Sequence, residues 1–372
     1  MVQAIQLHLV GGFLGSGKTT AIAQAAGILI ARGQRVGIIT NEQGRHLVDT
    51  ALFQAQAMPA LEVTGGCICC HLDDFAERIG EMVAQFDPQV IFAESVGSCT
   101  DLVATVIKPL QALQKNFGSP ASLSVFADAR LLLRYLRGLE MPFSEGVMYI
   151  YGSQLEEAGL IVINKADLLS QKDLNDVLHL AGKAYPGKAI RAQNSFDRSQ
   201  VADWLGIISS SASPLPQVSL DLDYDRYADG EGRFAWVDRE LVVTLTAPAD
   251  QHAILTFLEE MATDLASLKM PVAHLKCLVS DGHQSIKFSL TGADEAHTVF
   301  SPDTTAITLL NGKKFKIIIN AMVEGDLKRV EACLDSTWRD FSAQDGVNVE
   351  LAAAFTRVPG YPKPTMRIGN PI

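Results

Sequence analysis

The sequence predicts an α/β protein with two domains: a parallel β-sheet flanked by helices, followed by a smaller α+β carboxyl-terminal domain. The first half of the chain alternates short apolar runs with helix-forming stretches, which is typical of a parallel sheet covered on both faces. A glycine-rich loop joins the first run to the first helix, and two more polar motifs end later runs. Because ligands bind at the carboxyl ends of the strands in such sheets, we expect these motifs to lie at one edge.

The first domain is predicted over residues 1–208. Its strands are expected at Ile5–Val10, Val36–Thr40, Val90–Ala93, Leu123–Ala127 and Leu160–Ile163, with a further strand within residues 188–196. Its helices are expected near residues 18–32, 73–86, 100–116, 129–137 and 168–184. A domain of this length is large enough to bury its own hydrophobic core.

Residues 209–235 are predicted to form a linker, because a serine cluster, two prolines and an acidic stretch follow one another there. The smaller α+β domain is expected over 236–372. Its strands are predicted at Leu241–Thr246, His274–Val279, Ser285–Leu290, Thr305–Leu310 and Lys316–Asn320, and its helices at Gln251–Leu268 and Leu327–Asp335. Three prolines, Pro359, Pro362 and Pro364, predict an irregular tail.

The composition excludes several classes of protein. The chain has 372 residues, of which 48% are hydrophobic and 20% charged, so global disorder is not expected. A net charge of −11 argues against nucleic-acid and anionic-membrane partners. The sequence contains no long uninterrupted apolar run and starts in a strand rather than a signal peptide. We therefore expect a cytoplasmic protein.

Residues 11–20 read GGFLGSGKTT, a phosphate-binding loop of the pattern G-x-x-x-x-G-K-[ST]. Glycines let backbone N–H groups turn toward a phosphate, and the helix that follows adds positive charge at its N-terminus. Lys18 is expected to contact the β- and γ-phosphates and the Thr19 hydroxyl to bind Mg²⁺. The alternative is a glycine-rich turn. The fold is then a P-loop NTPase, with these predicted nucleotide-binding residues: Gly12, Gly15, Ser16, Gly17, Lys18, Thr19 and Thr20.

A second motif indicates which base is bound. The apolar run 160–163 ends in Asn164-Lys165-Ala166-Asp167. The Asp167 carboxylate can accept hydrogen bonds from both N1–H and the 2-amino group of guanine, a pair that adenine lacks. The Lys165 stem can pack on the ring, and Asn164 can tie this loop to the phosphate loop. The alternative is a turn before a helix. Ala192–Ser195 is a candidate for a second base-contacting loop.

Another apolar run, Val90–Ala93, ends at Glu94, where a carboxylate associated with Mg²⁺ is expected. Three residues later, the Gly97 N–H can sense a γ-phosphate. We therefore assign Glu94 and Gly97 to the catalytic residues, together with Lys18 and Thr19. The alternative for Glu94 is a carboxylate that merely ends a strand.

Three of the six cysteines lie close together in the pattern C-x-C-C. Such clustered thiols indicate metal or redox chemistry in a reducing compartment. Thiolates suit Zn²⁺, Cu⁺ and, less tightly, Co²⁺, and further ligands are open between Cys70 after a turn, His71 and Glu42. The alternative is a set of small buried thiols. The predicted metal ligands are Cys67, Cys69, Cys70 and Glu42, whereas Cys99, Cys277 and Cys333 are interpreted as packing residues.

Taken together, these motifs resemble those of the CobW-like metallochaperone GTPases, relatives of the HypB and UreG nickel-insertion GTPases. The matching segments are 11–20, 41–44, 65–70, 94–97 and 154–158 leading into 164–167. The resemblance implies a GTPase domain that handles a transition metal at C-x-C-C and serves a client metalloenzyme or corrinoid system. The chain departs from the family pattern at Arg45, where an acidic residue is common, and it has no histidine-rich stretch.

The leading hypothesis is therefore a Mg²⁺-dependent GTPase whose GTP/GDP cycle switches its affinity for a thiolate-bound Zn²⁺ or Co²⁺, with nickel also open. Its partner would be a client metalloprotein or a cofactor-assembly protein, and a nucleotide-dependent homodimer is a further candidate. Intrinsic hydrolysis should be slow, since the sequence shows no obvious water-activating glutamine or arginine finger. The alternatives are a GTP-gated assembly chaperone with a structural zinc and a module that senses or sequesters metal.

Overall fold

The computed structural model describes residues 5–41, 48–63, 66–113, 120–210, 214–247, 249–291, 310 and 312–370. The chain forms two compact units. The first contains Met1–Gln43, Ala57–Gly230 and Pro362–Ile372, and the second contains Gly44–Gln56 and Glu231–Tyr361. The chain therefore leaves the first unit and returns to it twice, rather than passing from one predicted domain to the next.

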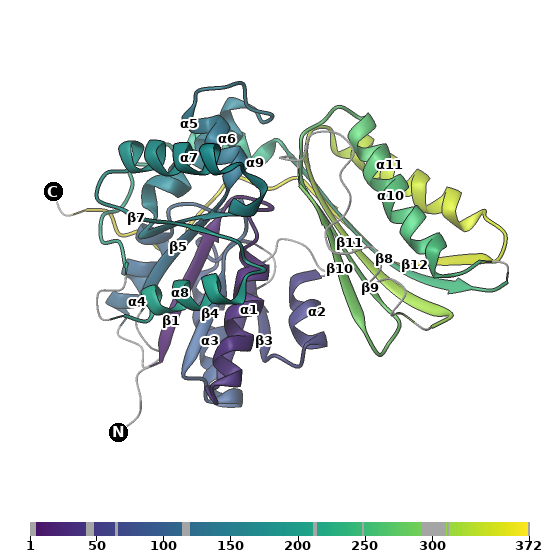
Figure 1. The fold of residues 1–372 in the computed structure, drawn as a ribbon, viewed down its shortest axis with the longest axis horizontal. Coiled ribbons are helices and arrows are strands. Elements are labelled where there is room, and N and C mark those ends of the chain that lie inside the picture. The colour runs from purple at the N-terminus through teal and green to yellow at the C-terminus, as the bar shows by residue number, and fades with distance from the viewer. Residues whose placement is uncertain are drawn as a thin grey trace. The chain divides into compact units, whose positions relative to one another are not determined.

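The first unit is built on a parallel sheet (Figure 1). Its seven strands run in the order β3-β2-β4-β1-β5-β6-β7, and every pairing is parallel. β1, from which the phosphate loop leaves, lies between β4 and β5, so the carboxyl ends of these strands meet at one edge. The strands are β1 (Gln6–Gly12), β2 (Val36–Asn41), β3 (Ala60–Val63), β4 (Val90–Glu94), β5 (Pro120–Asp128), β6 (Leu160–Asn164) and β7 (Ala189–Gln193).

Helices flank this sheet (Figure 1). All described residues of β2, β4 and β6 are buried, which is why these strands read as continuous apolar runs. The helices are α1 (Lys18–Ala31), α3 (Leu72–Phe86), η1 (Val103–Ile107), α4 (Lys108–Ala112), α5 (Ala129–Leu136), α6 (Glu145–Glu157), η2 (Ala166–Leu168), α7 (Gln171–Ala184) and α8 (Arg198–Ile208). α9 (Tyr224–Gly232) spans the division between the two units.

The second unit is an antiparallel sheet in the order β10-β9-β11-β8-β12, with helices α10 and α11 side by side on one face (Figure 1). Phe257 and Phe341 stack between these helices, with ring centroids 4.6 Å apart. The elements are α2 (Val48–Ala55), β8 (Phe234–Leu245), α10 (Gln251–Ser267), β9 (Val272–Ser280), β10 (Ser285–Leu290), β11 (Lys314–Glu324), α11 (Leu327–Ser342) and β12 (Val347–Arg357).

α2 follows the first unit's β2 along the chain but packs on the second sheet. Val48 contacts Leu278 and Ile318, which alternate with the side chains that face α10 and α11. Asp49 is buried and forms ion pairs with Lys276 (2.5 Å) and Lys287 (2.6 Å). α2 therefore packs on the sheet of the second unit.

The predicted fold class is confirmed: a P-loop-type parallel sheet and a separate α+β unit. The strand expected within 188–196 is present as β7. The helix expected near residues 100–116 is present from residue 102 as a π-helical turn that continues into α4, and residues 114–116 lie outside the described residues. Within the predicted linker, α9 is helical, and the strand expected at 305–310 lies, apart from Leu310, outside the described residues.

Helices α2 and α6 and strands β3 and β12 were not expected. Residues 358–370 form neither helix nor strand, and they return to the first unit, where Arg367 donates from Nε to the buried Asp101 carboxylate at 2.7 Å. Ile368 N–H bonds the carbonyl of Ala104 at 2.8 Å. The carboxyl-terminal segment therefore supports the loop that follows β4.

A buried carboxylate on α6 supports the same loop. Glu157 accepts from the Thr100 hydroxyl at 3.0 Å and from the Val103 N–H at 3.4 Å. Burial, and next the charge of Asp101, raises the pKa of Glu157 to about 8. Glu157 is therefore neutral in the folded protein at pH 7.

We expect the free energy of unfolding to fall less in the Glu157→Gln protein than in the wild type when the pH rises from 5 to 8. The unfolded chain releases the Glu157 proton near pH 4.5, whereas the folded chain keeps it to about pH 8. The folded state binds more protons in this window, so the free energy of unfolding falls as the pH rises, by roughly 3–5 kcal/mol. Urea unfolding at both pH values measures this difference. The control is Glu156→Gln, which changes the exposed carboxylate next to Glu157. Equal pH dependence of stability in the wild type and both variants would contradict the prediction.

Candidate functional site

The loop between β1 and α1 has a backbone that favours glycine. Gly12, Gly15 and Gly17 have φ of +120°, +71° and +90°. A Cβ at Gly12 would collide with the backbone of Phe126, and one at Gly17 with the Asn164 amide. This loop and the first turn of α1 hold all the predicted phosphate-binding residues: Gly12, Gly15, Ser16, Gly17, Lys18, Thr19 and Thr20.

Lys18 and Thr19, the first residues of α1, point their polar atoms into this loop. Lys18 Nζ donates to the carbonyls of Gly12 (2.9 Å) and Phe13 (3.3 Å). The Thr19 hydroxyl donates to Glu94 Oε1 at 3.0 Å, and both residues are buried. An ammonium group, a hydroxyl and a carboxylate therefore meet at a helix N-terminus, which fits a phosphate chain with its Mg²⁺.

The end of β4 lies against the phosphate loop. Val10 on β1 is in register with Glu94, and the Ser95 N–H donates to the Val10 carbonyl at 3.0 Å. A Cβ at Gly97 would lie 2.8 Å from the Leu14 side chain and 2.9 Å from Leu14 Cα. Only a glycine allows the backbone at position 97 to pack this closely on the loop.

Asn164, at the end of β6, ties three loops together. Its Nδ2 donates to the Ser16 carbonyl at 2.7 Å, and its Oδ1 accepts from the Ser195 hydroxyl at 2.7 Å and from the Ser195 N–H at 3.2 Å. The structure thus brings the N-K-x-D motif next to the phosphate loop and to the 192–195 loop, as the sequence motifs require.

The other two residues of the motif lie at its exposed side. Lys165 has a φ of +58°, and its Nζ pairs with Asp128 Oδ2 at 3.0 Å. Burial alone would raise the pKa of Asp128, but the Lys165 and Arg130 cations hold it below its usual range. Asp167 is exposed in η2, so its carboxylate is accessible to a base.

The cysteine motif lies in the loop between β3 and α3, and Asn41 at the end of β2 shapes it. Asn41 Nδ2 donates to the carbonyls of Val63 (3.1 Å) and Gly66 (2.7 Å), and its Oδ1 accepts from the Ile68 N–H at 2.9 Å. A turn then follows, in which the Cys70 N–H donates to the Cys67 carbonyl at 2.9 Å. This turn places Cys67 and Cys69 on the inner side of the loop.

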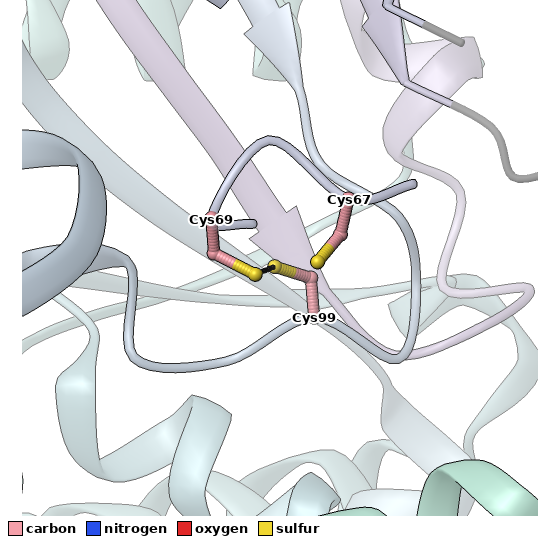
Figure 2. Close-up of side chains that lie close together, drawn as sticks. All are labelled: Cys67, Cys69 and Cys99. Atoms are coloured by element: carbon pink, nitrogen blue, oxygen red, sulfur yellow. Dashed lines mark hydrogen bonds between the residues drawn. The ribbon is translucent and has the colours of Figure 1, made fainter. Parts of the chain in front are cut away.

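Cys99, from the loop after β4, completes the group. Figure 2 shows the sulfur atoms of Cys67, Cys69 and Cys99 converging from two separate segments. The Cys99 and Cys69 sulfurs are 3.2 Å apart, and all three sulfurs lie within 4.8 Å of one another. We call these three residues the thiol cluster. Its members are almost fully buried, with exposures of 7%, 2% and 1% in that order.

The thiols change one another's acidity. Hydrogen bonds from Cys67 and Cys69 lower the pKa of Cys99 to about 7, although burial opposes this. The pKa of Cys69 is raised, first by its hydrogen bond with Cys67. Cys99 is therefore the first thiol of the cluster to ionise, and a divalent cation would replace the remaining protons.

Of the other predicted ligands, Cys70 borders the thiol cluster without being one of its three members. Cys70 is half-buried, with its sulfur 3.8 Å from that of Cys69, and its pKa is raised to about 12, first by a hydrogen bond with Cys67. His71 pairs with Asp74 at 3.3 Å, and Glu42 is outside the described residues. The interpretation of Cys99 as an isolated packing residue is wrong.

Sequence reasoning missed Cys99 as a candidate ligand and the contacts through which Asn41, part of the family motif at 41–44, shapes the cysteine loop. Cys99 is 30 residues from Cys69, so no local spacing connects the two. The signal that was available is position: Cys99 lies two residues beyond Gly97, in the loop that leaves the strand next to β1.

None of the helices in the described ranges is long and apolar enough to cross a membrane.

Comparison with known proteins gives several relatives. The chain is 31% identical over 197 residues to the zinc chaperone CobW of Sinorhizobium sp., covering 46% of this chain and 54% of the relative. It is 30% identical over 171 residues to the zinc chaperone YeiR of Escherichia coli K12, covering 43% and 46%. The chain spans about half the length of the curated relatives it matches.

Among solved structures, the chain matches zinc-bound YjiA GTPase from E. coli at 13% identity and a TM-score of 0.38, covering 90% of this chain and 99% of that one. HypB from Helicobacter pylori in complex with nickel gives 16% identity and a TM-score of 0.39, covering 55% and 85%. The family profile described as CobW/HypB/UreG, nucleotide-binding domain, matches residues 6–191, which is half of the chain. The chain therefore belongs to the CobW/HypB/UreG family through this nucleotide-binding domain.

Proposed function

We propose that this protein is a Mg²⁺-dependent GTPase that binds a transition metal at the thiol cluster and delivers it to a client metalloprotein or cofactor pathway. One observation carries the proposal. Glu94, which bonds Thr19 at the phosphate loop, and Cys99, which contacts Cys69, belong to one six-residue segment that starts at the last residue of β4. A nucleotide site and a thiolate site therefore share one short piece of backbone.

The donors of the nucleotide site suit GTP. The positive φ of Gly12, Gly15 and Gly17 lets backbone N–H groups turn toward a phosphate, and the α1 N-terminus adds positive charge. In our proposal, Lys18 exchanges its two carbonyl partners for phosphate oxygens, and Thr19 and Glu94 hold Mg²⁺ directly or through water. The metal ion would neutralise charge that develops on the phosphates.

Guanine would be bound by the loop that Asn164 holds in place. The exposed Asp167 would accept two hydrogen bonds from the base, and the Lys165 stem would cover its ring. Hydrolysis should be slow without a partner. Because Gly97 packs on Leu14, it is the residue best placed to sense the γ-phosphate.

Zinc is the first candidate metal, since three thiolates suit it and the curated relatives are named zinc chaperones. Co²⁺ is the second candidate. Half-buried Cys70 borders the cluster and could act as an exchangeable fourth ligand through which the metal is handed over.

All six cysteines are free, as a reducing, cytoplasmic location would require. A nucleotide-dependent homodimer is part of this proposal.

A second candidate function is favoured by the burial of the thiol cluster. Three sulfurs with so little exposure also suit a closed structural zinc site in a GTP-gated assembly chaperone. The two functions differ in metal exchange. A zinc that a chelator removes within minutes in one nucleotide state supports delivery, whereas a zinc retained in both states supports the structural alternative.

Lys18→Ala is expected to lower GTP affinity about 100-fold, or ~2.7 kcal/mol, because it removes the charged donor to the phosphates. Isothermal titration with Mg²⁺–GDP and a non-hydrolysable Mg²⁺–GTP analogue measures this. Lys172→Ala, an exposed lysine on α7, is the matched control. Tight binding by the Lys18→Ala protein would refute the nucleotide site.

Asp167→Asn is expected to change base preference. The asparagine amide would place an N–H donor opposite the N1–H and 2-amino donors of guanine. GTP affinity should therefore fall about 100-fold. Xanthine carries an acceptor oxygen in place of the 2-amino group, so XTP affinity should rise relative to GTP. Competition against a fluorescent GDP analogue measures both affinities, with exposed Asp203→Asn as control. An unchanged GTP-to-XTP ratio would mean that Asp167 does not contact the base.

The double substitution Cys67→Ser, Cys69→Ser should abolish stoichiometric Zn²⁺ binding, because two of the three buried sulfurs are lost. Equilibrium dialysis followed by elemental analysis gives the metal content. Cys333→Ser, a half-buried thiol in the second unit, should retain one equivalent. A double variant that still holds one equivalent would place the metal elsewhere.

A further inference from the structure

Residues 362–370 lie on the first unit without forming a helix or a strand, and we call them the strap. Arg367 attaches the strap to two other segments of this unit. Its Nε donates to Asp101 Oδ2 and its Nη2 donates to the Leu220 carbonyl, each at 2.7 Å. The strap therefore joins the loop after β4 to the segment that precedes α9.

The side chain of Asn370 attaches the other end of the strap to a backbone. Its Nδ2 donates to the Ser219 carbonyl at 2.8 Å, and its Oδ1 accepts from the Ser219 N–H at 2.8 Å and from Lys108 Nζ at 3.1 Å. Between the two side chains, the Ile368 N–H donates to the Ala104 carbonyl at 2.8 Å. We call the residues that hold the strap the strap site: Asp101, Ala104, Lys108, Ser219 and Leu220.

Polar bonds hold the strap more than apolar burial does. Pro362 is buried, Pro364 and Ile368 are half-buried, and the other residues of the strap are exposed. Each hydrogen bond adds little net stability, because water replaces it when the segment leaves. A segment held in this way can be displaced by another that makes the same bonds.

The buried Asp101 determines which segment can replace the strap. Its carboxylate is 0% exposed, and Arg367 supplies the cation that faces it at 2.7 Å. Burial raises the pKa of Asp101, and the hydrogen bond from Arg367 opposes this rise. Removal of one partner from a buried ion pair is strongly unfavourable. A partner that displaces the strap must therefore bring an arginine of its own.

The strap reaches the metal site at two points. The backbone N–H of Lys363 donates to the sulfur of Cys70, the half-buried thiol that borders the thiol cluster. Arg367 binds Asp101, which is two residues beyond Cys99. A segment that took the place of the strap would therefore lie beside the bound metal.

We propose that the strap site is the docking site of the client, and that it takes a non-helical client segment with an arginine followed, three residues later, by a side-chain amide. This rests on the proposed function and names the chemistry of its partner. The chain's own strap fills the site until such a segment displaces it. Displacement also withdraws the Lys363 N–H from Cys70, so this sulfur becomes available to the metal when the client is in place.

The test asks whether the strap site binds such a segment once the strap is released. The probe is a fluorescein-labelled peptide with the sequence of the strap, PKPTMRIGN, and fluorescence anisotropy gives its affinity. The proteins are the full-length wild type and the full-length double variant Arg367→Ala, Asn370→Ala. A tethered strap competes at an effective concentration of about millimolar. The double variant should therefore bind the peptide at least tenfold more tightly than the wild type.

Two further changes test the arginine requirement. A peptide that carries Arg367→Ala should bind the double variant at least tenfold more weakly, because Asp101 is left without a cation. Asp101→Asn, added to the double variant, should weaken the unchanged peptide by a similar factor. The control protein is Arg329→Ala, which changes an exposed arginine on α11 and should bind the peptide as the wild type does.

Release of zinc tests the connection to Cys70. The zinc-loaded double variant should lose its metal to a chelator at least threefold faster than the wild type, because Cys70 has lost its bond to Lys363. Saturating peptide, which carries Lys363, should restore the wild-type rate. Unchanged GDP affinity of the double variant shows that its nucleotide-binding domain is folded.

The failures of the two proposals can be told apart. A wild-type protein that binds no zinc overturns the proposed function, and the role of the strap in delivery with it. Equal peptide affinity of the wild type and the double variant, an unaffected Arg367→Ala peptide or an unchanged rate of zinc loss overturns the docking site alone. A wild type that is dimeric without nucleotide, with a monomeric double variant, would give the site to the strap of a second copy and also overturn it.

Discussion

The phosphate-binding side of the candidate site depends on the parallel pairing of β1 with β4. This pairing sets Val10 beside Glu94, so the phosphate loop and the loop after β4 leave the sheet at the same edge. Thr19 can then bond Glu94, and Gly97 can pack on Leu14. Neither contact is local in sequence. If this pairing slipped by one residue, the carboxylate would turn to the other face of the sheet and the site would lose its proposed Mg²⁺ ligand.

The strand order β3-β2-β4 makes the thiol cluster possible, because it brings the loop after β3 near the loop after β4. Burial of three sulfurs disfavours their ionised form, yet their mutual hydrogen bonds bring the pKa of Cys99 down to about 7. A divalent cation satisfies this arrangement better than protons do, because it neutralises several thiolates at once without needing water. Since Cys99 is on the loop that also packs against the phosphate loop, the charge of a bound metal and the charge of a nucleotide act on one segment. That is the physical basis on which a metal-binding site would respond to a nucleotide.

The sequence allowed the parallel sheet to be predicted because its strands are buried on both faces and read as apolar runs, as in Leu160–Ile163. Helix α6 could not be found in this way, since it is buried on most sides and carries little apolar periodicity. The C-x-C-C motif pointed to a metal, but Cys99 is joined to it only by strand order, which spacing does not encode. Asn41 was visible only as part of a family motif, and its role in shaping the cysteine loop depends on three backbone contacts.

The central claim is that one metal ion is held by sulfur atoms from two segments, the C-x-C-C loop and the loop after β4. Zinc K-edge X-ray absorption of the protein loaded with one equivalent of Zn²⁺ tests it most directly. The account predicts at least three sulfur neighbours at about 2.3 Å, falling by one in Cys99→Ser. Two or fewer sulfurs in the wild-type protein, or a spectrum unchanged by Cys99→Ser, would contradict it.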